Sequence, residues 1–325
     1  MTALSAFVVP VVTLGMLWVV PAGLGLVEGP RPPGWDRLRR AWPLLALPGA
    51  VSLWLPRSGT ATALAACYAL ATLALALQAP ARLLLTRSLR PGEVAVLTAL
   101  VSPSVAGLAL VAERAAYPLF GFELDLLALT VPHFHFAGFA AALVAGLLCA
   151  ASGEGPLARA AALSVPAGTL LVLAGYFVDD WAELAGAVVL TAGMAAVAVL
   201  TLRERRALAA GRATRTLLGV SALVLVVTMA LALWWALGEA TGLPHPTLTW
   251  MAATHGLGNA LGFAVCALLA HRRLRPAPPT DTGTDTDTGP ARITPATPSG
   301  PVPAAPPGAG AGDRPAPLPR TELPA

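Results

Sequence analysis

The sequence has few charged residues and no lysine. Only 12% of its 325 residues are charged, whereas a soluble domain carries about 25%. Hydrophobic residues make up 56% of the chain, and the mean hydropathy is +0.70. This composition excludes a water-soluble globular protein. The formal charge of +4 is too small to indicate a nucleic-acid-binding surface, so the lipid bilayer is the expected partner.

Cysteine is also scarce, and the motifs of common enzyme classes are missing. Cys67, Cys149 and Cys266 lie far apart in apolar stretches, without CxxC or CxxH spacing, which favours core residues over a disulfide framework. The sequence contains no GxxxxGK(S/T), HExxH or GxSxG motif, and no GxGxxG motif follows a strand. These absences argue against a nucleotide-driven pump and an ordinary hydrolase, so an enzyme is not favoured.

Long apolar runs fill most of the chain instead. A membrane-spanning helix needs about 20 mostly apolar residues, because the hydrocarbon core is about 30 Å thick. The pattern predicts an all-α, polytopic helical membrane protein with about nine transmembrane helices. Their ranges are 4–27, 41–55, 61–85, 94–111, 124–150, 157–178, 181–202, 217–237 and 248–270. The second range is the shortest and contains Pro43 and Pro48, so a re-entrant segment is the alternative there.

The arginines support this helix count because they fall on alternate loops. Cytoplasmic loops collect positive charge. One set of alternate loops carries arginine clusters at 31–40 and 203–215, whereas the other set carries only Arg57 and Arg114. Leaving out the second helix would break this alternation at the first loop. The pattern therefore predicts an amino terminus outside the membrane and a cytoplasmic carboxyl terminus.

The composition changes abruptly where the apolar region ends. Residues 1–275 are predicted to form the transmembrane helical domain. Residues 276–325 are rich in proline, threonine and glycine, with almost no large apolar side chain. Such a segment cannot bury enough surface to offset its chain entropy. A disordered cytoplasmic tail is therefore expected over 276–325.

Histidines at membrane depth are the main candidates for a functional site, because ionisable groups are costly there. His133 and His135 lie about 15 Å into the fifth predicted helix, and His255 lies about 11 Å into the ninth, at 1.5 Å per residue. Both helices run inward in the predicted topology, so the three imidazoles share a similar depth. An acidic outer rim is expected from Asp125, Asp179, Asp180 and Glu183.

Small residues follow two of these histidines at helical spacing. The predicted helix-packing residues are Gly138 and Ala142 on the fifth helix, and Gly258 and Gly262 on the ninth. Stripes of small residues let membrane helices approach closely. We therefore expect the fifth and ninth helices to pack together, with His135 facing His255 and Asn259 one turn below. His133 is two residues from His135 and is expected to point about 200° away.

Three functions are compatible with these residues. In the first, His133, His135, His255 and Asn259 form an outward-facing site that handles a small solute or protons, since imidazole titrates near neutral pH. In the second, the three histidines bind a transition metal or haem in a redox protein or enzyme. In the third, the protein is structural or sensory, and the histidines only join helices by hydrogen bonds. We favour a transporter or permease, and no cofactor is favoured.

Two short motifs connect the sequence to a known family. The segments HFHFAGF at 133–139 and HGLGNALGF at 255–263 resemble the YndJ-like family of bacterial integral membrane proteins. The matching positions are His133, His135, Gly138, Phe139, His255, Gly256, Asn259, Gly262 and Phe263. The resemblance implies a multi-pass protein of the bacterial plasma membrane, sometimes labelled a transporter, and it implies no particular reaction.

Overall fold

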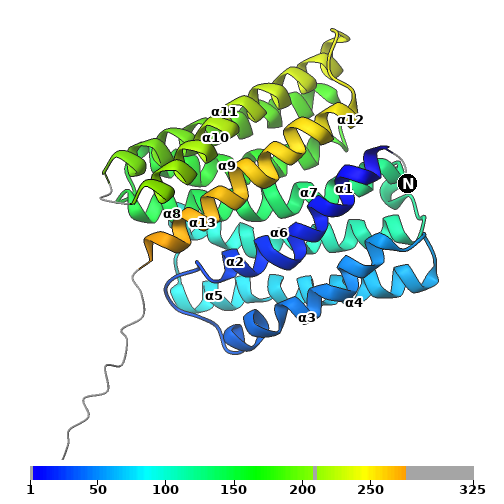
Figure 1. Ribbon diagram of the computed structural model, residues 1–325, viewed down its shortest axis with the longest axis horizontal. Helices are drawn as coiled ribbons and strands as arrows, with labels where there is room; N and C mark the ends of the chain where they lie inside the picture. Colours follow the sequence, from blue (N-terminus) through cyan, green and yellow to red (C-terminus); the bar gives the residue numbers. More distant parts are fainter. Residues whose placement is uncertain (1–2, 208–210, 276–325) are drawn as a thin grey trace, which may run out of the picture. The chain divides into compact units, whose positions relative to one another are not determined.

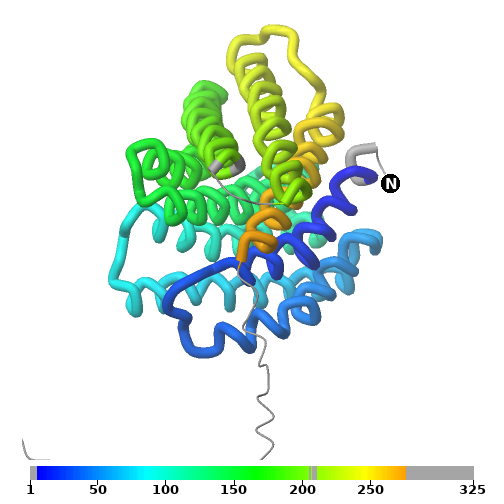
Figure 2. Tube along the Cα trace, turned by 60° about the vertical axis from the view of Figure 1, so that its left-hand side comes forward, coloured from blue at the N-terminus to red at the C-terminus, as the bar shows by residue number. Residues whose placement is uncertain are grey.

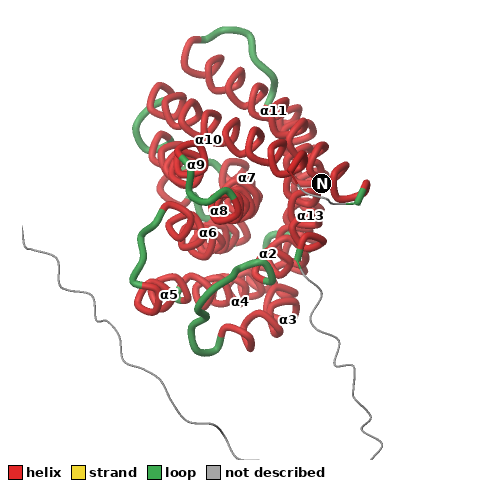
Figure 3. Tube along the Cα trace, turned by 90° about the vertical axis from the view of Figure 1, so that its left-hand side faces the viewer, coloured by secondary structure: helices red, strands yellow, loops and turns green. Residues whose placement is uncertain are grey.

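The computed structural model describes residues 3–207 and 211–275. Over these residues the chain is helical and contains no strand (Figure 3), as the sequence predicts. Nine helical stretches follow one another in the described part of the chain. The predicted tail, 276–325, lies outside the described residues.

Several of the nine stretches are composed of consecutive segments. They are α1 (Ala3–Leu14), η1 (Gly15–Val19) and α2 (Val20–Leu24); α3 (Trp35–Trp54); α4 (Gly59–Ala76) and α5 (Gln78–Thr86); α6 (Pro91–Arg114); α7 (Leu124–His133), η3 (Phe134–Ala141) and α8 (Ala142–Ala151); α9 (Pro156–Gly175); α10 (Asp180–Ala207); α11 (Arg212–Thr241); and α12 (Leu248–Met251), η4 (Ala252–Gly256), η5 (Gly258–Val265) and α13 (Cys266–Leu274). A short 3-10 turn, η2 (Leu119–Gly121), precedes α7.

Eight of these stretches are long and apolar enough to cross a membrane. The remaining one is α3, because its first turns carry Asp36 and three arginines. It is nevertheless one continuous helix of 20 residues, despite Pro43 and Pro48, which corresponds to about 30 Å at 1.5 Å per residue. It packs against α4. The chain is therefore a multi-span helical membrane protein.

The helices pack in layers, as Figure 1 shows. One side of the bundle is formed by α3 and α4, and α6 lies on α4. The opposite side is formed by α9, α10 and α11, which contact one another in chain order. Between them lie α7, η3 and α8, which contact α6. The first and last helical stretches run beside each other across these layers (Figure 2), where α1 contacts η4 and η1 contacts η5.

Glycine permits the closest approach between two helices, α9 and α10. A Cβ atom on Gly168 would lie 2.5 Å from the backbone nitrogen of Leu190, and one on Gly186 would lie 2.5 Å from the backbone nitrogen of Val172. Real Cβ atoms do not approach a backbone so closely, so these positions require glycine. Close backbone packing of this kind stabilises membrane helices, because lipid provides no hydrophobic drive for helices to associate.

Wider, π-helical turns occur in the first, fifth and ninth helical stretches. They form η1, η3, η4 and η5, and η1, η3 and η5 contact one another. His135 lies in η3 and His255 in η4, whereas His133 is the last residue of α7. π-Helical turns often accompany functional sites. The irregular segment η3, which bears His135, therefore contacts η5, the irregular segment that follows His255 and bears Asn259.

Candidate functional site

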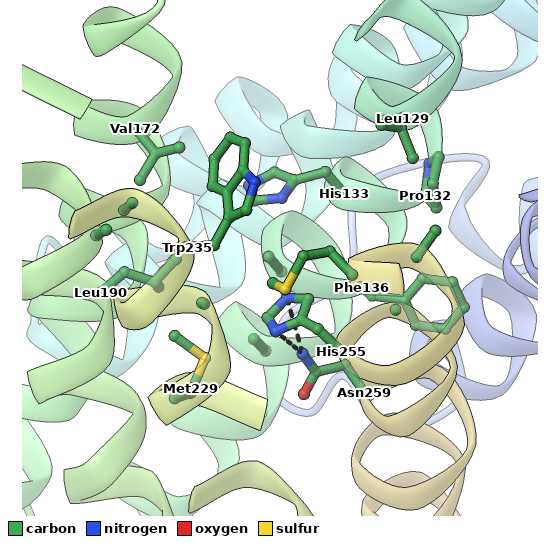
Figure 4. Close-up of a pocket in the computed structure, with 18 of the residues that line it drawn as sticks. Leu129, Pro132, His133, Phe136, Val172, Leu190, Met229, Trp235, His255 and Asn259 are labelled. Atoms are coloured by element: carbon green, nitrogen blue, oxygen red, sulfur yellow. Dashed lines mark hydrogen bonds between the residues drawn. The ribbon is translucent and has the colours of Figure 1, made fainter. Parts of the chain in front are cut away.

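A cavity of about 220 Å³ lies among the first, fifth and ninth helical stretches and α9, α10 and α11. Figure 4 shows it in close-up. Its polar lining residues are His133, Tyr176, Glu183, His255 and Asn259. Most of the remaining wall is apolar, including Leu129, Val172, Leu190 and Met229. Ligand sites are typically apolar hollows with a few convergent polar groups, so this cavity is the candidate site.

His133 lines the cavity and has an imidazole nitrogen without a protein partner. Its Nε2 atom is buried and makes no hydrogen bond within the described part of the chain. The ring meets Phe134 edge to face, with 5.6 Å between the ring centroids. In Figure 4 the His133 ring lies beside the cavity in the same region as the Trp235 indole. A buried polar atom that lacks a partner is costly, so a hydrogen bond from a ligand to His133 Nε2 would be favourable.

His255 is held by a closed chain of hydrogen bonds. Its Nδ1 lies 2.8 Å from the backbone carbonyl oxygen of Thr228, so Nδ1 carries the proton and donates. Asn259 Nδ2 lies 3.2 Å from His255 Nε2, to which it donates, and 3.5 Å from Nδ1. Figure 4 marks both contacts by dashed lines. The Thr228 hydroxyl donates to Asn259 Oδ1 at 2.8 Å. This pattern assigns a neutral imidazole whose orientation is fixed by its two neighbours.

His135 lies outside the cavity lining and is fully buried. Its Nδ1 donates to the backbone carbonyl of Val131 at 2.7 Å. The Tyr68 hydroxyl donates to Nε2 at 2.5 Å. The Tyr68 and His135 rings are nearly parallel, with centroids 5.9 Å apart, and Trp42 meets Tyr68 edge to face. Both imidazole nitrogens of His135 are therefore occupied by protein groups.

The structure corrects the predicted pairing of the histidines. We expected His135 to face His255, but His135 bonds to Tyr68, and His133 shares the cavity with His255. The spacing of His133 and His135 does place them against different neighbours. The prediction was wrong about which residues His133 and His135 contact. The period of a helix fixes the angle between two side chains, but it does not fix which neighbouring helix each side chain meets.

The small-residue stripes make close contacts, but with other helices than predicted. A Cβ atom on Gly138 would lie 2.8 Å from the Ser102 Cβ atom on α6. A Cβ atom on Gly262 would lie 2.7 Å from the Val224 side chain on α11. The stripe of the fifth helical stretch therefore packs on α6, and that of the ninth packs on α11. The fifth and ninth helical stretches do contact each other, through η3 and η5. However, the close contacts of Gly138 and Gly262 are made to α6 and α11.

The predicted acidic rim divides into exposed and buried members. Asp125, Asp179 and Asp180 are exposed. Glu183 is only 8% exposed, and it lines the cavity together with Tyr176. Glu183 therefore belongs to the cavity rather than to the surface.

The described residues do not fit a metal centre. Within 3–207 and 211–275, no group of three or more His, Cys, Asp or Glu side chains is placed to hold a metal ion. Both ring nitrogens of His135 and of His255 are occupied by protein groups. Only His133 among the three predicted histidines retains a ring nitrogen without a protein partner. A metal or haem held by these three histidines is therefore not supported by their geometry.

Sequence reasoning found part of this site and missed the rest. The spacing of His255 and Asn259, four residues apart on a helix, predicts that they meet. The sequence did not predict Thr228, Tyr176 or Trp235 as site residues, because their nearness to the histidines arises from contacts between distant helices. No local motif signals those contacts.

The fold and the cavity define a multi-span helical membrane protein with a polar site among its helices. The family model for YndJ-like proteins matches residues 10–263, a range that includes all the site histidines. The chain therefore belongs to the YndJ-like family, as its two motifs predict. No curated protein and no solved structure matches the chain.

Proposed function

We propose that the protein is a permease-like membrane protein that binds a small solute in the cavity and carries it across the bilayer. The observation that supports this proposal most strongly concerns His133, which lines a mostly apolar cavity and has a ring nitrogen without a protein partner. The helices around the cavity are long enough to span a membrane. Irregular helix around such a cavity supports the proposal, because transporters build solute sites from interrupted helices.

The histidines have different roles in this proposal. His133 meets the solute, since an unpaired buried polar group costs about 1–3 kcal/mol and a bound partner removes that penalty. His255 is a positioning residue, because Asn259 and Thr228 hold its ring at the cavity wall. His135 stabilises the bundle through Tyr68 and does not contact the solute.

The volume of the cavity limits the size of the solute. An apolar cavity of about 150 Å³ is sufficient to bind benzene. The cavity of about 220 Å³ therefore fits a molecule with one ring, or an equivalent apolar body, and a short polar substituent. Most of its wall is apolar, so the polar groups orient the solute while the apolar wall accounts for most of the contact.

We also propose the orientation that the arginines predict, with the amino terminus outside. The cavity is lined by the first turns of α10 and α12 and by Trp235 near the end of α11. In this orientation these helix ends lie toward the outer surface, and the site is in the outer half of the membrane. Residues 1–275 then form the transmembrane domain, and 276–325 form a cytoplasmic tail.

Binding of a neutral one-ring probe tests the site. Benzyl alcohol would be titrated into the purified full-length protein in lipid nanodiscs and followed by calorimetry. We expect saturable binding that is abolished by Ala232→Phe, which fills the cavity from α11. Ala230→Phe is the matched control, because Ala230 is exposed on the same helix. Absence of saturable binding, or equal binding to both variants, would overturn the site.

Transport is tested separately in proteoliposomes. Uptake would be measured for one-ring solutes of different charge: benzamide, benzyltrimethylammonium and phenylacetate. We expect wild-type protein to accelerate uptake of at least one of them over Ala232→Phe. If uptake of all three is the same with wild-type protein, with this variant and with empty vesicles, the permease proposal fails.

A further inference from the structure

We infer that the solute is a small organic cation with an apolar body, and that the Glu183 carboxylate receives its positive charge. This inference rests on the proposed solute site and adds the chemical class of the solute. The evidence is the charge and burial of Glu183, at the end of the cavity where α10 begins, and the aromatic side chains that line the cavity.

Glu183 is a buried acid without a cationic partner in the described part of the chain. The other buried acid, Glu113, pairs with Arg114, and the half-buried Glu93 pairs with Arg82. The half-buried Glu204 also has an oxygen without a partner, but it does not line the cavity. The ion pairs of the described residues leave Glu183 out, and the cavity lining contains no arginine. A buried carboxylate is costly unless it is paired. A cationic solute would supply the missing partner.

The groups around Glu183 add negative charge rather than cancel it. Asp180 lies in the same first turn of α10, and both Asp180 and Glu239 are close enough to interact electrostatically with Glu183. Tyr176, which also lines the cavity, carries no positive charge. His245 lies 3.2 Å from Glu239 and is partnered by it. Low-dielectric walls concentrate such a field inside a cleft, so this end of the cavity attracts cations.

The walls favour an organic cation over an inorganic ion. The aromatic side chains in the lining are Phe7, Phe136, Tyr176, Trp235 and Phe263. Aromatic faces attract ammonium groups within about 6 Å of the ring centroid. A hard cation such as Ca²⁺ requires about six to eight oxygen ligands, whereas this lining offers few oxygen atoms. The volume also suffices for one ring and a compact ammonium group.

Three probes of similar size and different charge test this inference. Benzyltrimethylammonium, benzyl alcohol and phenylacetate would be titrated into wild-type protein and Glu183→Gln in nanodiscs. We expect wild-type protein to bind the cation at least tenfold more tightly than the alcohol, and the anion most weakly. In Glu183→Gln the affinity for the cation should fall to that for the alcohol, while the affinity for the alcohol stays within twofold of wild type.

Asp125→Asn is the matched control, because it removes an exposed charge from the first turn of another helix, α7, and does not line the cavity. Exposed charges are screened by salt beyond about 8 Å at physiological ionic strength, so the cation affinity should change less than twofold. A second variant, Trp235→Leu, should weaken binding of the cation more than binding of the alcohol. It provides an independent measurement if Glu183→Gln does not fold.

The possible failures are distinguishable. Equal affinities of wild-type protein for the cation and the alcohol, or a cation preference that persists in Glu183→Gln, would overturn the inference and leave the proposed solute site intact. If neither the alcohol nor the cation binds to wild-type protein, the solute site itself fails. A tighter interaction with phenylacetate than with the cation would also overturn the inference.

Discussion

The Tyr68 hydroxyl and the His135 Nε2 atom are 2.5 Å apart and join α4 to η3 across 67 positions of sequence. Both side chains are fully buried. The other His135 ring nitrogen bonds to Val131 within its own helical stretch. The pair therefore ties two layers of the bundle together, whereas the neighbouring His133 lines the cavity and has a ring nitrogen without a protein partner.

Removing the Tyr68 hydroxyl should destabilise the protein. Tyr68→Phe leaves the buried His135 Nε2 without a donor, which costs about 1–3 kcal/mol. We expect a lower unfolding temperature for the purified protein in detergent, measured by circular dichroism. Tyr117→Phe is the control, because Tyr117 is 60% exposed, and it should unfold like wild type. Equal unfolding temperatures for the two variants would show that the Tyr68 bond contributes nothing.

The glycine contact between α9 and α10 should not tolerate a methyl group. Gly168→Ala places a Cβ atom 2.5 Å from the Leu190 backbone, and overpacking of this kind costs about 1–3 kcal/mol. Its unfolding temperature should fall relative to wild type. Gly59→Ala, with nothing within 4 Å of the new atom, should cause no loss. If Gly168→Ala is as stable as Gly59→Ala, the two helices are not packed as closely as described.

The hydrogen-bond chain around His255 should be sensitive to the Thr228 hydroxyl. Thr228→Val keeps the shape of the side chain but removes the donor to Asn259 Oδ1. Side-chain hydrogen bonds between membrane helices contribute about 0.6 kcal/mol on average, so a small loss of stability is expected. Nitrogen NMR of labelled histidine should also show a change at His255. Thr241→Val, a change of an exposed threonine on the same helix as Thr228, should leave the His255 signals unchanged. A wild-type spectrum for Thr228→Val would refute the hydrogen-bond chain.

The position of α3 can be tested by cysteine labelling. Pro33 and Gly59 are exposed residues on either side of α3. In a background without the native cysteines, a membrane-impermeant maleimide should label Gly59→Cys in intact cells and Pro33→Cys only after permeabilisation. That result would place the two ends of α3 on opposite sides of the membrane. Labelling of both variants from the same side would make α3 re-entrant and would overturn the proposed orientation.

Helix positions were largely predictable from apolar run length. The predicted range 124–150 coincides with the stretch from α7 to α8, and 61–85 coincides with α4 and α5 within two residues at each end. The second helix was predicted too short, at 41–55 rather than Trp35–Trp54. Its charged first turns are helical although they are not apolar, and hydropathy does not register such turns.

The membership of the site was less predictable. His133, His255 and Asn259 were identified because polar groups at membrane depth are rare. The involvement of Glu183 in the cavity was not predicted, since an acid near a helix start is normally exposed at the membrane surface. The interior position of Glu183 follows from the packing of α10 against its neighbours.

The sequence by itself determined the class of the protein, its helical stretches and its family. It could do so because lipid forces each membrane-crossing segment to satisfy its own backbone hydrogen bonds, which makes a spanning helix a local property of the chain. Only the tertiary structure decided that His135 meets Tyr68 and that His133 shares a cavity with His255 and Glu183. Those relationships depend on how each helix is rotated against its neighbours, and shape complementarity among many small residues sets that rotation.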